Sequence, residues 1–365
     1  MTDLQKALDA FVAAGFASIQ VRVHDEHGEW AGTAGIRELG SAEAPPVDGR
    51  FWAGSVVKTF TATAVLQLVA EGKLELDAPV AGHLPGLALD GRITARMLLQ
   101  HTSGLFNYTG EYFPDGTIVP GIPATGKEWV EARLRSYRPQ ELVEPALAHP
   151  ARFEPGADWS YSNTNYTVAA LLIERVTGQS YGEAMHQRIL GPLGLRDTVL
   201  DGDVTDLPEP YAHGYYRYQD GDEWKVADVS RQNLSMLLGA GGLISTTRDL
   251  RTFFAALNGG RVLPAPLLAE MRSPVGPIGY GLGVFVQDLG AGLGTVLHHN
   301  GGAPGGYGAL MYSTPDGSRT LTAGLTTGDA EVNPAEAMPA ALDALIKAWI
   351  SAEPLPDAPD PASAA

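Results

Sequence analysis

The chain has 365 residues, 44% of them hydrophobic, which is enough to bury the core of one or two domains. Its formal net charge of −17 argues against nucleic acid or an anionic membrane surface as a partner, because both require a basic face. The sequence has no cysteine, which excludes disulfides and thiolate metal sites. No apolar run is as long as a membrane span, and the N-terminus has no signal-peptide pattern. We therefore expect a cytoplasmic protein, or a secreted one if a leader has been removed.

The N-terminal part of the chain is predicted to form a helix and a hairpin. Residues 1–14 are amphipathic with helical spacing. Residues 17–24 and 29–34 alternate apolar and polar side chains around a turn at 25–28, which is typical of a hairpin. Residues 37–49 are predicted to be a loop.

A predicted helix from Ser55 to Ala70 carries a single charge, that of Lys58, before it ends at Gly72. A helix that is apolar on nearly every side belongs in the protein interior. A buried ammonium without a partner tends to lose its proton, so we expect Lys58 to titrate low and to act as a base. Ser55 lies three residues earlier on the same helix face, where unpaired backbone N–H groups stabilise an anion. The S-x-x-K spacing alone arises by chance about once in such a chain, but its apolar surroundings favour an acylating serine.

The middle of the chain is predicted to be rich in loops and short helices. Residues 93–100 form one helix, and residues 105–153 contain many Gly, Pro and Tyr residues without clear periodicity. We expect this segment to provide a wall of a cleft. A longer helix is predicted to be capped by Asn163 or Thr164 and to stop at Gly178.

The last part of the chain is predicted to contain mainly strands, so that strands at both ends enclose a helical middle. A hairpin over 211–218 and 223–226 and a helix over 247–257 precede strand candidates at 281–286, 295–299, 308–313 and 320–325 and a helix over 334–350. The middle therefore resembles an insertion. The predicted divisions are a discontinuous α/β domain of 1–75 and 236–352, a mostly helical inserted domain of 76–235, and a disordered tail of 353–365.

A second candidate site lies at the start of the helix that follows Tyr161. A hydrolase needs a proton donor for its leaving group as well as a nucleophile. Tyr161 and Asn163 place a phenol and an amide two residues apart. A plain helix cap beside a packed tyrosine would give the same pattern.

A third candidate site is the strand that ends at His299, followed by Gly301 and Gly302. Glycine in a strand lets a backbone N–H approach a substrate closely, although an ordinary strand end is the alternative. His298 is expected to point to the opposite face from His299, so the two are a poor pair of metal ligands.

Together these places resemble the serine penicillin-recognising family, which includes the D,D-carboxypeptidases, class C β-lactamases and related esterases and amidases. The similarity is greatest to the soluble secreted D,D-carboxypeptidases and covers nearly the whole chain. The motifs that carry it are Phe51-x-x-Gly-Ser55-Val-x-Lys58, Leu68-Val-x-Glu-Gly-Lys-Leu-x-Leu-Asp77-x-Pro79, His101-Thr-Ser-Gly-Leu105, Tyr161-Ser-Asn-Thr-Asn165, Gly281-Leu-Gly283 and His299-x-Gly301.

The resemblance implies a role for each matching residue. Ser55 would be the acylated nucleophile, Lys58 its partner in proton transfer and Tyr161 the proton relay. Asn163 would bind the amide on the acyl side of the substrate, and His299 would occupy the first place of the third motif. The amides of Ser55 and Gly302 would form the oxyanion hole. The implied fold is α+β, a five-stranded antiparallel sheet flanked by helices, with a helical domain inserted and the cleft between them.

The chain departs from the carboxypeptidase pattern on the leaving-group side. Where those enzymes have two hydroxyl residues and an arginine that grip a free carboxylate, this sequence has Asn300, Gly302 and Phe285. We therefore expect amides, esters or internal peptide bonds to be preferred over a free acid. An arginine from elsewhere, Arg231 or Arg248, would reverse this expectation if it reached the site.

The function predicted from the sequence is an acyl-serine hydrolase or transferase acting on peptides, amides or esters with a D-residue on the acyl side. The alternatives are a D-alanyl-D-alanine carboxypeptidase, an esterase or β-lactamase, a D-aminopeptidase and a peptide cyclase. A receptor that binds a β-lactam and stays acylated is the alternative from a different class. We expect a monomer with a small-molecule or peptide substrate, no cofactor and no metal.

Overall fold

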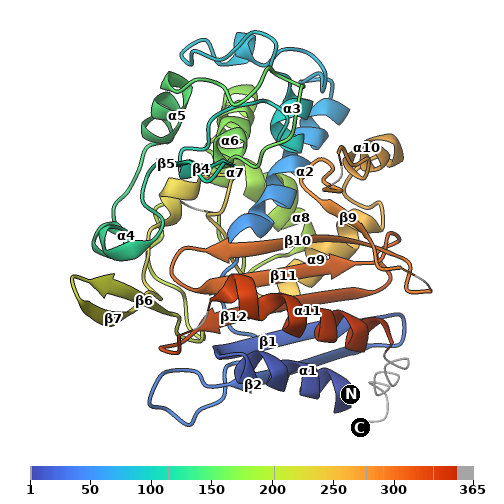
Figure 1. Ribbon diagram of the computed structural model, residues 1–365. Helices are drawn as coiled ribbons and strands as arrows, with labels where there is room; N and C mark the ends of the chain where they lie inside the picture. Colours follow the sequence, from blue (N-terminus) through green and yellow to red (C-terminus); the bar gives the residue numbers. More distant parts are fainter. Residues whose placement is uncertain are drawn as a thin grey trace.

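A computed structural model describes residues 2–113, 115–200, 202–276, 278–290, 292–331 and 333–351. Within these residues the fold is built on a six-stranded sheet whose neighbouring strands are all antiparallel (Figure 1). The strand order is β2 (Glu29–Gly35), β1 (Phe16–His24), β12 (Thr320–Thr327), β11 (Tyr307–Ser313), β10 (Thr295–Ala303) and β9 (Phe285–Asp288). The predicted α+β class is confirmed, but the sheet has six strands where the family resemblance implied five.

The sheet joins the two ends of the chain. Strand β1 pairs with β2 on one side and with β12 on the other. The expected strand over 281–286 starts too early, because residues 281–284 form a turn in which the Gly281 N–H donates to the Val284 carbonyl at 2.8 Å. Gly283 has a φ of +78°, which few other residues adopt, so the strand begins only at Phe285.

Helices cover both faces of the sheet. Helices α1 (Thr2–Ala13) and α11 (Pro334–Ile350) lie against one face, and α2 (Val57–Ala70) and α9 (Thr247–Asn258) lie on the other side (Figure 1). Side chains alternate along β10, so Val296 packs with the α1 and α11 layer while Leu297 packs with the α2 layer. This alternation decides which residues of β10 face the serine.

The part of the chain between β2 and β9 contributes the remaining helices and three small strand pairs. The helices are α3 (Ala95–Gln100), α4 (Gly126–Ala132), α5 (Pro139–Ala148), α6 (Asn163–Thr177), α7 (Tyr181–Met185), α8 (Gly191–Leu193) and α10 (Ala265–Met271). The pairs are β3 (Phe51–Trp52) with β8 (Ile244–Ser245), β4 (Gly110–Tyr112) with β5 (Ile118–Pro120), and β6 (Tyr215–Asp220) with β7 (Glu223–Asp228).

One segment of this middle part contains more regular structure than its sequence indicated. Residues 105–153 contain α4, α5 and the β4–β5 pair. Helix α5 has prolines at positions 139 and 145, which hide its periodicity, yet it buries Leu142 and Val143. The predicted tail, residues 353–365, lies outside the described residues. No helix in the described ranges is long and apolar enough to cross a membrane.

Candidate active site

Ser55 lies in a short 3-10 turn, Gly54–Val56, that leads into helix α2. The sequence placed it in the α-helix itself. Strand β3 precedes the turn, and the Ala53 N–H donates to the Leu243 carbonyl at 2.8 Å, which ties the turn to β8. The chain therefore holds Ser55 at the end of a buried strand and at the start of a buried helix.

Two glycines allow β10 to approach this turn. Gly54 has a φ of +58°, and a Cβ atom there would lie 2.4 Å from the Gly302 carbonyl oxygen. A Cβ atom on Gly301 would lie 2.0 Å from the Ala53 carbonyl oxygen. Both contacts are too short for a side chain, so only glycine brings these backbones together. At Gly302 a Cβ atom would meet nothing within 4 Å, so that position borders open space.

Lys58 is completely buried, one helical turn after Ser55. Its Nζ atom lies 3.2 Å from Ser55 Oγ, 2.9 Å from Asn163 Oδ1 and 2.5 Å from the Ala240 carbonyl oxygen. No ion pair joins it to a carboxylate in the described part of the chain. Burial lowers the pKa of Lys58 well below its ordinary value, because the charged form loses its hydration without a compensating charge.

The three contacts of Lys58 suit a neutral amine. The Asn163 and Ala240 oxygens can only accept hydrogen bonds, so they take the two N–H bonds of the amine. In the neutral form of the amine, the lone pair is left for the third neighbour, Ser55 Oγ at 3.2 Å, whose hydroxyl can donate to it. The geometry therefore orients a base toward the serine proton.

Tyr161 contacts the serine from the other side. Its hydroxyl lies 2.8 Å from Ser55 Oγ. Burial raises the pKa of Tyr161 to about 12, and its hydrogen bond to Ser55 opposes this only in part. The phenol therefore keeps its proton at neutral pH and can donate it to an atom near Ser55 Oγ.

Asn163 is held at the first residue of α6 by a polar loop. Its side-chain amide donates to Thr109 Oγ1 at 3.2 Å, and its backbone N–H donates to Asn107 Oδ1 at 3.0 Å. The N-cap position belongs to Ser162, one residue before the predicted Asn163 or Thr164, and its side chain makes no cap bond. Asn107 supplies the cap instead, because its side chain reaches the exposed helix start from a loop far away in sequence.

His299 is buried, and it makes no described hydrogen bond to Ser55 or Lys58. Its Nδ1–H donates to the Asn300 carbonyl at 2.8 Å, so Nε2 accepts from the Tyr280 hydroxyl at 3.3 Å. Burial lowers the pKa of His299 to about 3, because the charged imidazolium would lose its hydration there. The imidazole is therefore neutral in the physiological range.

Of the side chains predicted for the leaving-group side, Asn300 lies on the other face of β10, whereas the Phe285 ring on β9 contacts both His298 and His299, the latter with ring centroids 5.5 Å apart. His298 stacks between the rings of Phe285 and Tyr312, with ring centroids 5.1 and 4.7 Å away, so it faces away from His299 as predicted. Asn300 donates its amide to the Tyr312 hydroxyl at 2.9 Å. No described contact joins Asn300 or Phe285 to Ser55, Lys58 or Tyr161.

The two arginines considered from the sequence are engaged elsewhere. Arg231 pairs with Asp206, and Arg248 pairs with Asp48. Both side chains are mostly exposed, and neither has a described contact with a candidate site residue. Among the described residues no group of three or more His, Asp or Glu side chains is arranged to hold a metal ion.

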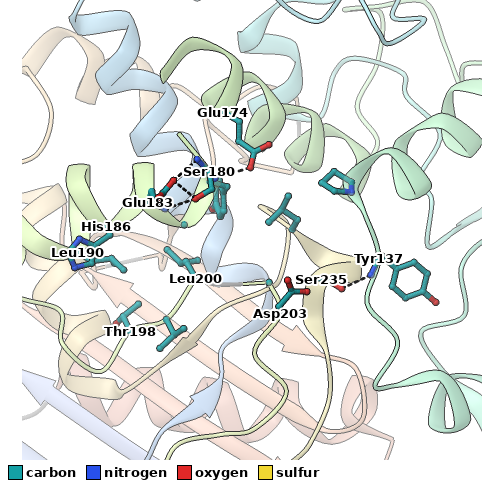
Figure 2. A pocket seen from close by; sticks show the side chains of 16 residues that line it. Tyr137, Glu174, Ser180, Glu183, His186, Leu190, Thr198, Leu200, Asp203 and Ser235 are labelled. Atoms are coloured by element: carbon teal, nitrogen blue, oxygen red, sulfur yellow. Dashed lines mark hydrogen bonds between the residues drawn. The ribbon is translucent and has the colours of Figure 1, made fainter. Parts of the chain in front are cut away.

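A separate cavity of about 520 Å³ lies beside α7 (Figure 2). Tyr181, Leu200 and Leu238 line it, and its edge carries Glu174 and Glu183. None of the candidate catalytic residues lines this cavity. Glu174 and Glu183 accept hydrogen bonds from the backbone around Ser180 and so stabilise the start of α7 (Figure 2).

This fold and this side-chain cluster define a member of the serine penicillin-recognising proteins. The chain belongs to the beta-lactamase family, whose sequence profile matches residues 4–346.

Solved structures share the fold over almost the whole chain. A D-stereospecific amidohydrolase from Streptomyces sp. is 38% identical, with a TM-score of 0.82, over 96% of this chain and 98% of that one. The D-amino acid amidase from Ochrobactrum anthropi SV3, in complex with L-phenylalanine amide, is 26% identical, with a TM-score of 0.77, over 94% and 97% of the two chains.

Longer relatives match as well. The penicillin-binding protein 4 of Amycolatopsis lactamdurans is 29% identical over 315 residues, which cover 81% of this chain and 76% of that protein. The chain is also similar to two penicillin-binding proteins of Bacillus subtilis, and it spans only 63% and 53% of their lengths.

Proposed function

We propose that the protein is an acyl-serine hydrolase that cleaves amides or esters of D-amino acids and D-peptides. The observation that carries the proposal is the position of Ser55 Oγ, 3.2 Å from the amine of Lys58 and 2.8 Å from the hydroxyl of Tyr161. The D-configuration of the substrate is supported by the similarity to the amidohydrolase and the amidase, whose names state a D-substrate.

In the proposed acylation, the neutral amine of Lys58 takes the hydroxyl proton of Ser55 while Oγ bonds to the substrate carbonyl carbon. The backbone N–H groups of Ser55 and Gly302 stabilise the oxyanion that forms. Tyr161 gives its proton to the leaving nitrogen or oxygen as the bond to the carbonyl carbon breaks, and the ammonium of Lys58 restores the tyrosine proton.

Deacylation uses the same groups in the opposite direction. A water molecule loses a proton to the pair of Lys58 and Tyr161 and attacks the acyl carbon. Ser55 Oγ recovers a proton from the same pair as the ester bond breaks. The products are a free acid and the leaving amine or alcohol. An acceptor amine in place of water would give transfer or cyclisation, so the identity of the acceptor decides between hydrolysis and aminolysis.

We further propose that the active-site cleft lies between the two predicted domains. Ser55 and His299 come from the discontinuous domain of 1–75 and 236–352, whereas Tyr161 and Asn163 come from the inserted domain of 76–235. Helix α2 and β10 would form one wall of the cleft, and the start of α6 would form the other. The substrate is a small molecule or short peptide, and a monomer remains the expected state.

A paired substrate panel tests the proposal. The D- and L-forms of phenylalanine amide and methyl ester are incubated with the protein and with Ser55→Ala, and product masses are read over time. We expect release of D-phenylalanine by the unchanged protein only. Equal turnover of the L-forms would contradict the proposed preference for D-substrates. Turnover by Ser55→Ala would contradict the proposed acyl-serine mechanism.

A further inference from the structure

The geometry points to His101 as the residue that positions Tyr161 against Ser55. This inference rests on the proposed function, because it assigns a partner to the proposed proton donor. His101 ends helix α3 and is completely buried. Its φ of 63° and ψ of 34° are left-handed, and in the described part of the chain no other residue besides glycine has a positive φ. A left-handed backbone is strained for a residue with a side chain, so some compensating contact must hold His101 in it.

The compensating contacts lie on both sides of Tyr161. The backbone N–H of Ser160 donates to the His101 carbonyl at 2.9 Å. The backbone N–H of Ser162 donates to His101 Nδ1 at 3.2 Å. The imidazole ring itself lies against the Tyr161 ring, with centroids 4.6 Å apart. One residue thus fixes the main chain before and after Tyr161 and also supports its ring.

The hydrogen bonds define the state of the imidazole. A backbone N–H can only donate, so Nδ1 must be an acceptor and the proton of the neutral ring must be on Nε2. The amide of Asn165 also reaches Nδ1 at 3.1 Å and therefore presents its nitrogen. Burial lowers the pKa of His101 well below its ordinary value, which keeps Nδ1 free to accept.

His101 has no path for transferring a proton to the reacting atoms. Its Nε2 is buried and has no hydrogen-bond partner among the described residues, and the ring centroids of Tyr166 and Tyr280 lie 5.2 and 5.1 Å from its own. No described contact joins it to Ser55. It is therefore a positioning residue and acts through Tyr161.

This role predicts a specific kinetic pattern. Ser55 and Lys58 belong to another element, so losing His101 should leave the nucleophile and its base in place. The Tyr161 hydroxyl would no longer be held at hydrogen-bonding distance from Oγ, and small errors of this kind are costly in catalysis. We expect kcat to fall while KM changes little, and only when the Tyr161 hydroxyl is present.

The test is a double-mutant cycle with a conservative rescue. His101→Leu removes the acceptor, whereas His101→Asn keeps an acceptor oxygen at the place of Nδ1 and tolerates a left-handed backbone. Each is made alone and with Tyr161→Phe, and kcat and KM for D-phenylalanine amide are measured beside the melting temperature. His149→Leu, which removes an exposed histidine stacked on Phe106, is the matched control. If His101→Leu does not fold, His101→Gly replaces it as the variant without an acceptor.

We expect the acceptor-free variant to lower kcat on the order of tenfold to a hundredfold with Tyr161 present, and by less than about twofold in the Tyr161→Phe background. His101→Asn should recover most of the loss, and His149→Leu should have no effect on kcat. An equal loss in both backgrounds, or no rescue by asparagine, would overturn the positioning role while leaving the proposed function intact. A Tyr161→Phe protein with full activity would instead overturn the proposed role of Tyr161 and this inference with it.

Discussion

The two halves of the candidate site are held in place by different means. Ser55 and Lys58 lie three residues apart at the start of one buried helix, so the helix itself sets their distance. Tyr161 and Asn163 are more than 100 residues away in sequence, and each reaches the first half through one hydrogen bond. Their places depend on loop residues, above all His101, Asn107 and Thr109.

This difference indicates where the site can be adjusted. A change in the helix pair would alter the proposed nucleophile or its proposed base directly. A change in the loops that support the second half would alter the proposed proton donor and substrate contact by degrees. The following predictions test that division, beginning with the largest effect.

Among changes in the second half of the site, removing the tyrosine hydroxyl should cause the largest loss of activity. Tyr161→Phe should lower kcat by roughly two to four orders of magnitude, the usual worth of a positioned acid or base. The ring and its packing remain, so the melting temperature should change little. Steady-state kinetics with D-phenylalanine amide gives the result. Near-normal turnover with an unchanged melting curve would make Tyr161 a packing residue.

The buried base of the first half should be visible in the pH dependence of stability. The pKa of Lys58 is lowered in the folded state, so between that pKa and about 10.4, the value for an unfolded lysine, the unfolded chain binds one more proton. Unfolding free energy should therefore rise with pH in this window, by up to about 1.4 kcal/mol per pH unit. Lys58→Met has no ionisable group at this position, so it lacks this pH-dependent contribution to the unfolding free energy.

Urea unfolding of both proteins at several pH values isolates the contribution of Lys58. The difference in unfolding free energy, wild type minus Lys58→Met, should increase with pH inside the window and stay level outside it. A difference that stays constant at every pH, or that falls as pH rises, would show that the lysine keeps its charge when folded.

The leaving-group side should discriminate against a free carboxylate. Phe285 offers no donor, and Asn300 offers one neutral amide that Tyr312 already binds. A carboxylate taken from water without charged donors is disfavoured. An acyl-D-Ala-D-Ala amide should therefore exceed the corresponding acid in kcat/KM by at least about tenfold, or ~1.4 kcal/mol. A clear preference for the acid would restore the carboxypeptidase interpretation.

The smallest predicted effect concerns the support of Asn163. Thr109→Val keeps the shape of the side chain but removes the hydroxyl, which accepts from the Asn163 amide and donates to Asn107 Oδ1. A neutral hydrogen bond is worth about 0.5–1.5 kcal/mol, so kcat/KM should fall roughly twofold to tenfold. Thr252→Val is the control, because the one hydrogen bond of the Thr252 hydroxyl among the described residues is to the Arg248 carbonyl within α9. A loss as large as that of Tyr161→Phe would mean that the loop does more than support Asn163.

The sequence predicted the half of the candidate site whose residues, Ser55 and Lys58, lie close together in the chain. A serine and a lysine at helical spacing in an apolar stretch define their own geometry, and the structure brings them together with Tyr161. The 3-10 turn at Ser55 lies where Gly302, from a distant part of the chain, approaches Gly54 closely, and local residue spacing does not show such a contact. The sequence motif around His101 was visible, but its contacts with the residues beside Tyr161 depend on a loop conformation without periodicity.

The loops of residues 105–153 were the least predictable part. Asn107 and Thr109 hold Asn163, yet nothing in their own spacing indicates it, since the contacts form only after the chain has folded. Asn300 shows the reverse case. Its position in the third motif suggested a substrate contact, while the period of two along β10 turns its side chain toward Tyr312.

The central claim, that Ser55 is acylated by a D-configured substrate, can be tested on the covalent intermediate itself. The protein is mixed with D- or L-phenylalanine methyl ester, quenched in acid during turnover, digested and analysed by mass spectrometry. We predict a phenylalanyl adduct on the peptide that contains Ser55, present with the D-ester and absent with the L-ester and in Ser55→Ala. An adduct on another residue would contradict the account. So would turnover of the D-ester if neither the unchanged protein nor Tyr161→Phe showed an adduct at any quench time.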